Sequence, residues 1–309
     1  RYNEYIDEKK EIIKKEINEE RQILLENFLP LNEVENIIRN KDRTLWDRKI
    51  EHYDFLSVRL GIGSMPSYIK IAFPEEHFSI EKDDLRKIGD ELVNQNKYID
   101  NVPIVASFLN RRYTSFIGNK DYLRRYFDGI ILQLIAYHSY DNLNIVVLSN
   151  NDERDYWKKY NSIPHFWDTS KEIRFIGTNM EENNYISNYL LKVLQARVTS
   201  SEDKDNKVNL EEAYKRFTPY YLIITDNIEI TKKLSFINEL LSNPVNYGFS
   251  LIVLSDTIDN LPNEINEFVN LDPMESTMYE SAIISNNQVK FIPELPNTNL
   301  NDCYIKICN

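Results

Sequence analysis

The sequence predicts an α/β fold in which helices flank a mostly parallel sheet, with one long charged helix ahead of it. Three observations favour this class. Apolar runs of strand length alternate with amphipathic runs of helix length along most of the 309 residues. Residues 113–148 read as strand, glycine turn, helix and strand, which is the βαβ unit of a parallel sheet. The run 220–225 is apolar on both faces, which is typical of a central strand in such a sheet.

Residues 1–27 are predicted to form a single charged helix. Its apolar residues make one narrow stripe, formed by Ile6, Ile13, Ile17 and Leu24. Glu and Lys fill the other faces and can pair at i,i+4, so the helix is typical of a stalk or half of a coiled coil. Pro30 ends it, and we therefore expect a stalk helix at 1–28 and a domain at 29–309. Because the chain begins at Arg1, inside a helical pattern without a capping residue, we expect a fragment of a longer protein.

The front of the domain is predicted to contain three strands and a helix. Residues 54–63 form the first strand, and 68–73 form a second one after Pro66. We expect these two to make a hairpin, or a pair of edge strands laid on the main sheet. A helix at 83–94 and a strand at 103–107 then lead to the βαβ unit.

The second half of the chain continues the alternation. The predicted helices cover 121–137, 152–160, 182–198, a short run up to 217, and 231–242. The predicted strands cover 173–176, 220–225 and 249–254. An acidic, polar loop without a hydrophobic anchor covers 199–209. In the tail from 268 onward we expect short strands around 283, at 289–292 and at 304–307.

Composition argues against several classes of protein. The net charge of −12 disfavours nucleic acid as a partner of the whole chain, and the seven glycines disfavour a dinucleotide-binding fold. Cys303 and Cys308 are the only cysteines, which indicates a reducing compartment without a disulfide framework. The four histidines are scattered, so the sequence predicts no metal site. No apolar run approaches the length of a membrane span, and we expect no signal peptide.

The turn after the strand 113–117 is where nucleotide-binding proteins of this architecture hold phosphates on a helix N-terminus. A phosphate loop needs several glycines and a Gly-Lys-Ser/Thr exit. Here Gly118 stands alone before Asn119, Lys120 and Asp121, and the carboxylate of Asp121 would repel a phosphate. Losing two or three charge-assisted hydrogen bonds, worth roughly 1.5–3 kcal/mol each, costs about three to six decades of affinity. We therefore expect Lys120 to be a solvent-facing lysine of the first turn.

Asp226 ends the strand 220–225, where a Walker B aspartate would hold magnesium. The active pattern adds a second acidic residue, but Asn227 stands there. We therefore expect Asp226 to cap the following turn or helix. His138 and His165 could form a catalytic pair with an Asp or Ser, although hydrogen-bonded structural histidines at the edge of the sheet are the favoured interpretation.

Several motifs, in the right order, carry a resemblance to a known family. They are Leu45-Trp-Asp-Arg48, Asp54-Phe-Leu-Ser-Val-Arg-Leu-Gly-Ile-Gly63, Gln133-Leu-Ile-Ala-Tyr-His-Ser-Tyr140, Pro164-His-Phe-Trp167 and Arg174-Phe-Ile176. With them, nearly the whole chain resembles the membrane-proximal cytoplasmic domain of the FtsK/SpoIIIE-type ATPase of type VII secretion systems, called EssC in Firmicutes and EccC in actinobacteria. The first two motifs are fairly specific.

The resemblance implies a RecA-like, P-loop-NTPase-type fold in which this domain lacks a competent nucleotide site. The vestigial pocket would consist of Gly118, Asn119, Lys120, Asp226 and Asn227. No cofactor or metal is implied here, since ATP and Mg²⁺ are expected only in downstream domains. The family motif residues that could contact other domains are Trp46, Arg48, Phe55, Arg59, His138, His165 and Trp167. The sequence leaves open whether Trp46 and Arg48 make such a contact or anchor the first strand to the main body.

The resemblance also implies a setting for the chain. Two transmembrane helices would precede residues 1–27, and several RecA-like ATPase domains would follow. The domain would then lie at the cytoplasmic face of the cell membrane, with downstream ATPase domains, membrane subunits of the secretion system and further copies of itself as partners. Export substrates of the family are small helical-hairpin WXG-type proteins, thought to engage a more distal ATPase domain.

The resulting hypothesis is a non-catalytic pseudo-ATPase that couples the membrane segment to the ATPase domains behind it. Two rivals remain. A divergent NTPase would use Lys120 and Asp226, with the nucleotide site completed by a neighbouring subunit, and turnover of ATP would favour it. A DNA-translocating FtsK/SpoIIIE-type motor is disfavoured by the acidic charge, and salt-sensitive DNA binding would favour it.

Overall fold

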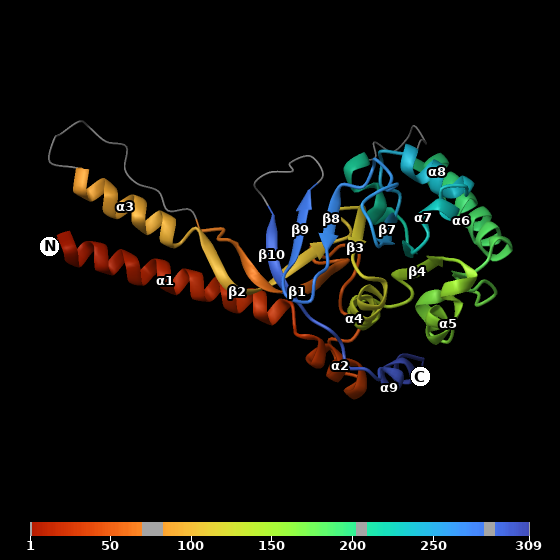
Figure 1. Cartoon of the computed structure of the whole chain (residues 1–309), viewed down its shortest axis with the longest axis horizontal. Coiled ribbons are helices and arrows are strands. Elements are labelled where there is room, and N and C mark those ends of the chain that lie inside the picture. Colours follow the sequence, from red (N-terminus) through yellow and green to blue (C-terminus); the bar gives the residue numbers. More distant parts are fainter. Residues whose placement is uncertain (1, 70–82, 202–208, 281–287, 309) are drawn as a thin grey trace.

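The computed structural model describes residues 2–69, 83–201, 209–280 and 288–308. In these residues a ten-stranded sheet runs through the molecule with helices against it (Figure 1). The strands are β1 (Ser57–Pro66), β2 (Tyr98–Ser107), β3 (Tyr113–Ile117), β4 (Leu143–Leu148), β5 (Ile176–Gly177), β6 (Tyr220–Thr225), β7 (Phe249–Ser255), β8 (Glu267–Asn270), β9 (Ser276–Glu280) and β10 (Val289–Pro293). The α-helices are α1 (Tyr2–Asn27), α2 (Leu31–Asn40), α3 (Asp83–Gln95), α4 (Lys120–Tyr137), α5 (Arg154–Trp157), α6 (Met180–Ser201), α7 (Ile228–Thr231), α8 (Ser235–Ser242) and α9 (Asn301–Cys308). Short 3₁₀ segments cover Asn151–Glu153, Lys158–Tyr160, Pro164–Phe166 and Leu210–Arg216.

The sheet has a parallel half and an antiparallel half. Its strand order is β2-β1-β10-β9-β8-β3-β7-β6-β4-β5. From β8 to β5 neighbouring strands are parallel, whereas from β2 to β8 they are antiparallel. The predicted α/β fold is confirmed, and the predicted βαβ unit is β3, α4 and β4, with β7 and β6 inserted between its two strands.

Helices cover both faces of the parallel half because its strands are apolar at successive positions. In β4, Ile145 and Val147 belong to the apolar cluster that contains α4, whereas Val146 and Leu148 belong to the cluster that contains α6 and α8. All six residues of β6 are buried, as predicted for a central strand. The parallel half is therefore a layer packed on both faces, and its strand ends present side chains at a common edge.

The long charged helix is confirmed as α1, which runs away from the sheet and holds the N-terminus at its far end (Figure 1). Its apolar stripe is partly covered, since Ile13 is buried and Ile17 and Leu24 are half-buried. Arg21 of α1 donates a hydrogen bond to the Asp100 carbonyl of β2 at 3.2 Å. None of the helices in the described ranges combines the length and apolar character needed to cross a membrane. The division at residue 28 stays a prediction.

β1 pairs with strands that are distant in the sequence, so the predicted local hairpin is wrong. Its neighbours are β2 and β10, while Tyr68 and Ile69 form no strand and residues 70–73 lie outside the described ranges. The two motif glycines permit this pairing. A Cβ on Gly61 would lie 2.0 Å from the Ile292 carbonyl oxygen, and one on Gly63 would lie 2.2 Å from that of Lys290.

The predicted strand at 304–307 is also wrong, because the segment is the helix α9. Cys303, Tyr304 and Ile307 form its buried face, which contacts α2. A short apolar run is compatible with both the helical and the strand period, so the packing of this segment against α2 determines that it is a helix. The predicted strand at 289–292 is confirmed as β10, and the one around 283 falls outside the described residues.

The predicted strand at 173–176 is mostly loop. Only Ile176 and Gly177 join the sheet as β5, and Arg174 forms an isolated bridge with Trp167. The predicted helix at 152–160 is α5 with a 3₁₀ segment on either side, and the predicted short run up to 217 is a 3₁₀ segment. The predicted helix at 231–242 is interrupted between α7 and α8. The predicted helix at 182–198 is α6, which extends to Ser201 and so into the predicted loop at 199–209, of which residues 202–208 lie outside the described ranges. The predicted strands at 220–225 and 249–254 are β6 and β7.

Candidate functional site

A cavity of about 350 Å³ lies at the edge of the sheet where the parallel strands β3, β4, β6 and β7 end. Lys120, Asp226 and Asn227 from the predicted pocket line it together. The structure thus brings both halves of the predicted nucleotide site to one place. This follows from topology, because the carboxyl ends of parallel strands share one edge of a sheet.

Glu153 lines this cavity and binds two of the basic residues of α4, Lys120 and Arg124. It is 2% exposed and forms ion pairs with Lys120 Nζ and Arg124 Nη2. Burial raises the pKa of Glu153, but the hydrogen bonds from Arg124 and Lys120 outweigh burial and hold the pKa below its usual value. Lys120, expected to face solvent, is 59% exposed at its side chain yet paired with Glu153.

The connection between β3 and α4 is too short to wrap an anion. β3 ends at Ile117 and α4 begins at Lys120, so Gly118 and Asn119 alone connect them. Asn119 Oδ1 accepts hydrogen bonds from the backbone N–H groups of Asp121 (3.1 Å) and Tyr122 (3.2 Å). The amide donors that a phosphate would use are therefore partly satisfied by the chain itself.

Asp226 is a half-buried hydrogen-bond acceptor and not a cap, so the predicted cap role is wrong for this residue. Its Oδ1 accepts from Ser149 Oγ at 2.6 Å, and its Oδ2 accepts from Trp157 Nε1 at 2.7 Å. Burial raises the pKa of Asp226 above its ordinary value. The cap is Asn227, whose Oδ1 accepts from the N–H of Ile230 at 3.1 Å at the start of α7.

A second group of predicted residues gathers at the other end of α4. The backbone N–H of Trp46 donates to the Ala136 carbonyl and its Nε1 donates to the Ile135 carbonyl, both at 2.9 Å. The N–H of Arg48 donates to the Tyr137 carbonyl at 2.9 Å. These are carbonyls of the last helical turn, which have no partner within a helix. The Leu-Trp-x-Arg motif therefore caps the C-terminus of α4.

The side chain of Arg48 also binds the end of α1. Arg48 is 6% exposed, and its Nη2 donates to the Asn27 carbonyl at 2.9 Å, while its Nη1 donates to that of Ser57 at 2.7 Å. Its Nε pairs with Asp54 at 2.9 Å, and its guanidinium lies 3.9 Å from the ring centroid of Tyr137. The sequence left open whether Arg48 contacts another domain or anchors the first strand to the main body. These contacts show that it anchors the strand.

Arg59 of β1 makes a similar contact with the end of α1. Its Nη1 donates to the Phe28 carbonyl at 2.8 Å, and its Nε and Nη2 bind both carboxylate oxygens of Glu294. Its backbone N–H and C=O pair with the side-chain amide of Gln133 in α4. Arg48 and Arg59 together thus hold the end of α1 against α4 and β1, and we call these two arginines with their carbonyl partners the α1 junction.

His138 and His165 are buried, neutral and next to one another. Burial lowers the pKa of His138 to about 3 and that of His165 to about 4. His138 Nε2 accepts from the Leu56 N–H at 3.1 Å, so its proton is on Nδ1, which donates to the Leu134 carbonyl at 2.9 Å. His165 Nε2 donates to the His138 carbonyl at 2.7 Å. These contacts match the favoured structural interpretation.

Two aromatic motif residues complete this region. Phe55 is fully buried with its ring edge-on to His138 at 5.0 Å between centroids. Trp167 Nε1 donates to the Asn161 carbonyl at 2.7 Å. Phe55 therefore lies in the interior and Trp167 is half-buried at its border, and a contact of Trp167 with another domain stays a prediction.

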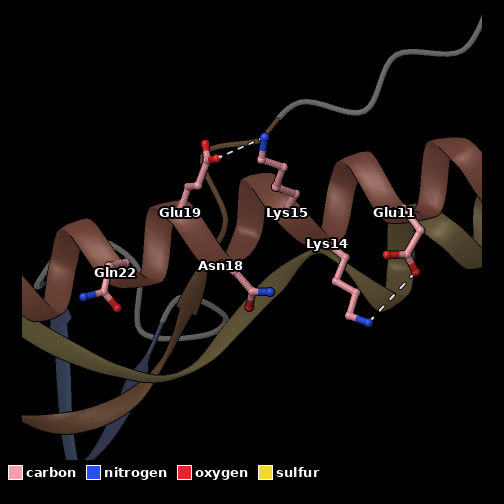
Figure 2. Close-up of a pocket in the computed structure, with 6 residues that line it drawn as sticks. All are labelled: Glu11, Lys14, Lys15, Asn18, Glu19 and Gln22. Carbon is pink, nitrogen blue, oxygen red and sulfur yellow. Dashed lines mark ion pairs between the residues drawn. The ribbon is translucent and has the colours of Figure 1, made fainter.

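A shallow hollow on α1 carries no comparable chemistry. Figure 2 shows that its lining residues all belong to this one helix. Its charges are paired along the helix, Lys14 with Glu11 at 4.0 Å and Lys15 with Glu19 at 3.8 Å. In the described part of the chain, no group of three or more His, Cys, Asp or Glu side chains is placed to hold a metal ion.

Sequence reasoning missed Glu153, Arg124 and Glu294. Glu153 follows β4 and so belongs to the same sheet edge as Asp226, a signal that was available. It stands between Asp152 and Asp155, however, and the sequence does not distinguish the buried acid from the exposed ones. No sequence pattern indicates that Glu294 binds Arg59, because the two residues lie 235 positions apart.

Comparison with known proteins bears on this geometry. No model of a protein family matches the chain. The type VII secretion system protein EssC of Staphylococcus aureus strain MSSA476 is 26% identical over 300 residues, which is 95% of this chain and 20% of EssC. The chain is homologous to part of EssC. The ESX secretion system protein EccC of Geobacillus thermodenitrificans is 20% identical over 269 residues, or 87% of this chain and 18% of EccC. The chain thus spans about a fifth of the length of these relatives.

Solved structures show the fold. The cytoplasmic domain of the type VII secretion ATPase EccC from Thermomonospora curvata aligns with a TM-score of 0.56 and 14% identity, covering 90% of this chain and 34% of that one. ATPases 2 and 3 of EssC from Geobacillus thermodenitrificans align with a TM-score of 0.54 and 10% identity, covering 85% of this chain and 50% of that one. The fold is therefore that of the EssC and EccC ATPase domains, as predicted.

Proposed function

We propose that this chain is a non-catalytic coupling domain of a type VII secretion ATPase. The observation that carries the proposal is the connection between β3 and α4. Gly118 and Asn119 alone form it, and the Asn119 side chain occupies amide donors of the helix. A nucleotide has neither a loop to enclose its phosphates nor a free lysine, because Lys120 is paired with Glu153.

The coupling role is supported by the position of α4. The helix has 18 residues, which correspond to about 27 Å at 1.5 Å per residue. Its first turns carry Lys120 and Arg124 at the cavity, and its last turn is capped by Trp46 and Arg48. Because Arg48 also binds the end of α1, one rigid helix joins the vestigial pocket to the stalk.

The similarity to EssC and EccC supports a proposal for the setting of the domain. We propose that α1 leads back to a transmembrane segment, that the domain lies at the cytoplasmic face of the membrane, and that downstream ATPase domains of the same protein are its partners. Other membrane subunits of the secretion system and further copies of the chain complete the assembly. ATP and Mg²⁺ act only in the downstream domains, and nucleic acid is no partner.

Calorimetric titration of Mg·ATP into the chain tests the proposal. We expect no binding at micromolar nucleotide for the wild type, with Lys120→Ala as the matched control and circular dichroism to show that both proteins are folded. Saturable micromolar binding that weakens in Lys120→Ala would overturn the proposal and favour a divergent NTPase. Steady hydrolysis of ATP by the chain would do the same.

A further inference from the structure

The basic residues of the cavity are arranged as an anion site that the protein fills with its own carboxylate. Lys120 and Arg124 lie one helical turn apart on α4 and reach the same side chain. That side chain, Glu153, comes from the segment after β4 and is 2% exposed. A buried carboxylate paired with one lysine and one arginine has the negative charge and the cationic partners that a bound phosphate oxygen would have.

We propose that Glu153 is an internal substitute for a phosphate, and that it keeps the cavity permanently in an occupied state. The inference deepens the proposed function and depends on it, since a domain that binds ATP has no use for an internal anion. In a nucleotide-dependent domain, the ligand links the helix after the first strand to the neighbouring strand ends. Here the Glu153 carboxylate makes the same link, between α4 and the segment after β4, without a ligand.

The rest of the cavity explains why a nucleotide is not the occupant. Asp226, Asp256 and Asp259 line it as well, so several carboxylates oppose a polyphosphate. Of the cationic residues that line the cavity, Lys120 and Arg124 are both committed to Glu153. We therefore expect that removing Glu153 exposes a site for one small anion, inorganic phosphate, rather than for ATP.

The test is rescue of a Glu153→Ala variant of the whole chain by inorganic phosphate. Without phosphate, Lys120 and Arg124 repel each other, and the thermal midpoint should fall below that of the wild type. Phosphate should raise the midpoint of the variant but not of the wild type, with sodium chloride at matched ionic strength as the control. Isothermal titration should show phosphate binding about ten- to a hundredfold tighter than in the wild type, the effect of one charge-assisted hydrogen bond.

Two further variants keep the result interpretable. Glu153→Gln preserves the shape of the side chain and should show the same rescue if Glu153→Ala does not fold. The double variant Lys120→Ala/Glu153→Gln should lose the rescue. Equal stabilisation of wild type and Glu153→Gln by phosphate, rescue that survives in the double variant, or no rescue at all would each overturn the inference. Binding of Mg·ATP by the wild type would instead overturn the proposed function.

Discussion

His165 shows how a single buried side chain sets a pH dependence. Its Nε2 donates to the His138 carbonyl, while its Nδ1 is buried without a hydrogen-bond partner. A second proton on this ring would therefore be an unpaired buried charge. The same reasoning applies to His138, whose accepting Nε2 already receives the Leu56 N–H. Neither ring is placed to transfer protons to a substrate, and both instead join the Trp46 segment and β1 to the core.

The first prediction concerns acid stability. The pKa of His165 is lowered to about 4 from its ordinary 6.5. The neutral ring therefore contributes to the free energy of unfolding above pH 6.5, and this contribution is lost as the pH falls through 4. The contribution amounts to about 3 kcal/mol. His165→Gln keeps a donor towards the His138 carbonyl but does not titrate. We expect urea unfolding between pH 6.5 and 4.5 to lose less stability in this variant than in the wild type.

The exposed His52 provides the control for this experiment. His52→Gln should show the acid dependence of the wild type. An unchanged slope in His165→Gln would contradict the assignment of this acid dependence to the buried ring.

At the scale of elements, the α1 junction is the contact on which coupling depends. Arg48 is buried and holds the carbonyls of Asn27 and Ser57 together with the carboxylate of Asp54. Its removal leaves Asp54 without its guanidinium and takes the Nη2 donor away from the Asn27 carbonyl. Arginine suits this place because its planar, five-donor group reaches three acceptors at once.

We therefore predict that Arg48→Ala lowers the free energy of unfolding by about 3–5 kcal/mol, the cost of breaking a buried ion pair. Backbone amides in the last turn of α1 should exchange with solvent faster than in the wild type, as measured by hydrogen exchange. Lys14→Ala, in an exposed pair with Glu11 on the same helix, should change stability by less than about 0.5 kcal/mol. Unaltered exchange in that last turn would show that Arg48 does not hold α1.

The pairing of β1 with β10 gives a second prediction at this scale. Gly61→Ala places a Cβ 2.0 Å from the Ile292 carbonyl oxygen, and a backbone atom cannot move aside without breaking the strand pair. We expect a loss of at least about 3 kcal/mol in chemical denaturation.

Gly129 in α4 is the matched control for this substitution. An added Cβ there meets the end of the flexible Leu31 side chain at 2.9 Å, and alanine favours a helix over glycine by about 1 kcal/mol. Gly129→Ala should therefore be much less destabilising than Gly61→Ala. Equal effects of the two substitutions would contradict a specific role of Gly61 in the sheet.

For the whole molecule, the decisive feature is the joint between the two halves of the sheet. β8 pairs in parallel with β3 and antiparallel with β9. At this joint, Glu267 lies directly opposite Glu280, and Arg111 pairs with both. Burial raises the pKa of Glu267 from its ordinary 4.5 to about 7, Arg111 acting against the shift and Glu280 adding to it. The charge state of the joint therefore changes near neutral pH.

The sign of this effect is opposite to that of the histidines. A raised carboxyl pKa stabilises the fold below pH 4.5, and this contribution is lost as the pH rises through about 7. Its size is on the order of 3 kcal/mol. We predict that Glu267→Gln is more stable than the wild type at pH 8 and close to it at pH 5, as measured by urea unfolding.

Glu275→Gln serves as the control, since Glu275 and its partner Lys290 are both exposed. It should shift stability by no more than about 0.5 kcal/mol at either pH. A stability difference between Glu267→Gln and the wild type that is equal at pH 5 and pH 8 would rule out titration of Glu267.

The sequence alone determined the features that depend on neighbouring residues. The charged helix α1, the buried strand β6 and the apolar body of α4 follow from local periodicity, because each pattern repeats within a few residues. The short turn around Gly118, which lacks the residues of a phosphate loop, could also be predicted, since a phosphate loop is recognised from consecutive residues.

Only the tertiary structure decided which distant segments meet. Burial and charge that come from distant parts of the chain decide the partners of β1 and the helical state of α9. They also decide the ion pairs of Arg59 with Glu294 and of Lys120 with Glu153. Local patterns do not encode such contacts: a strand can pair with any strand of suitable face, and one acid among several becomes buried only when the fold closes around it.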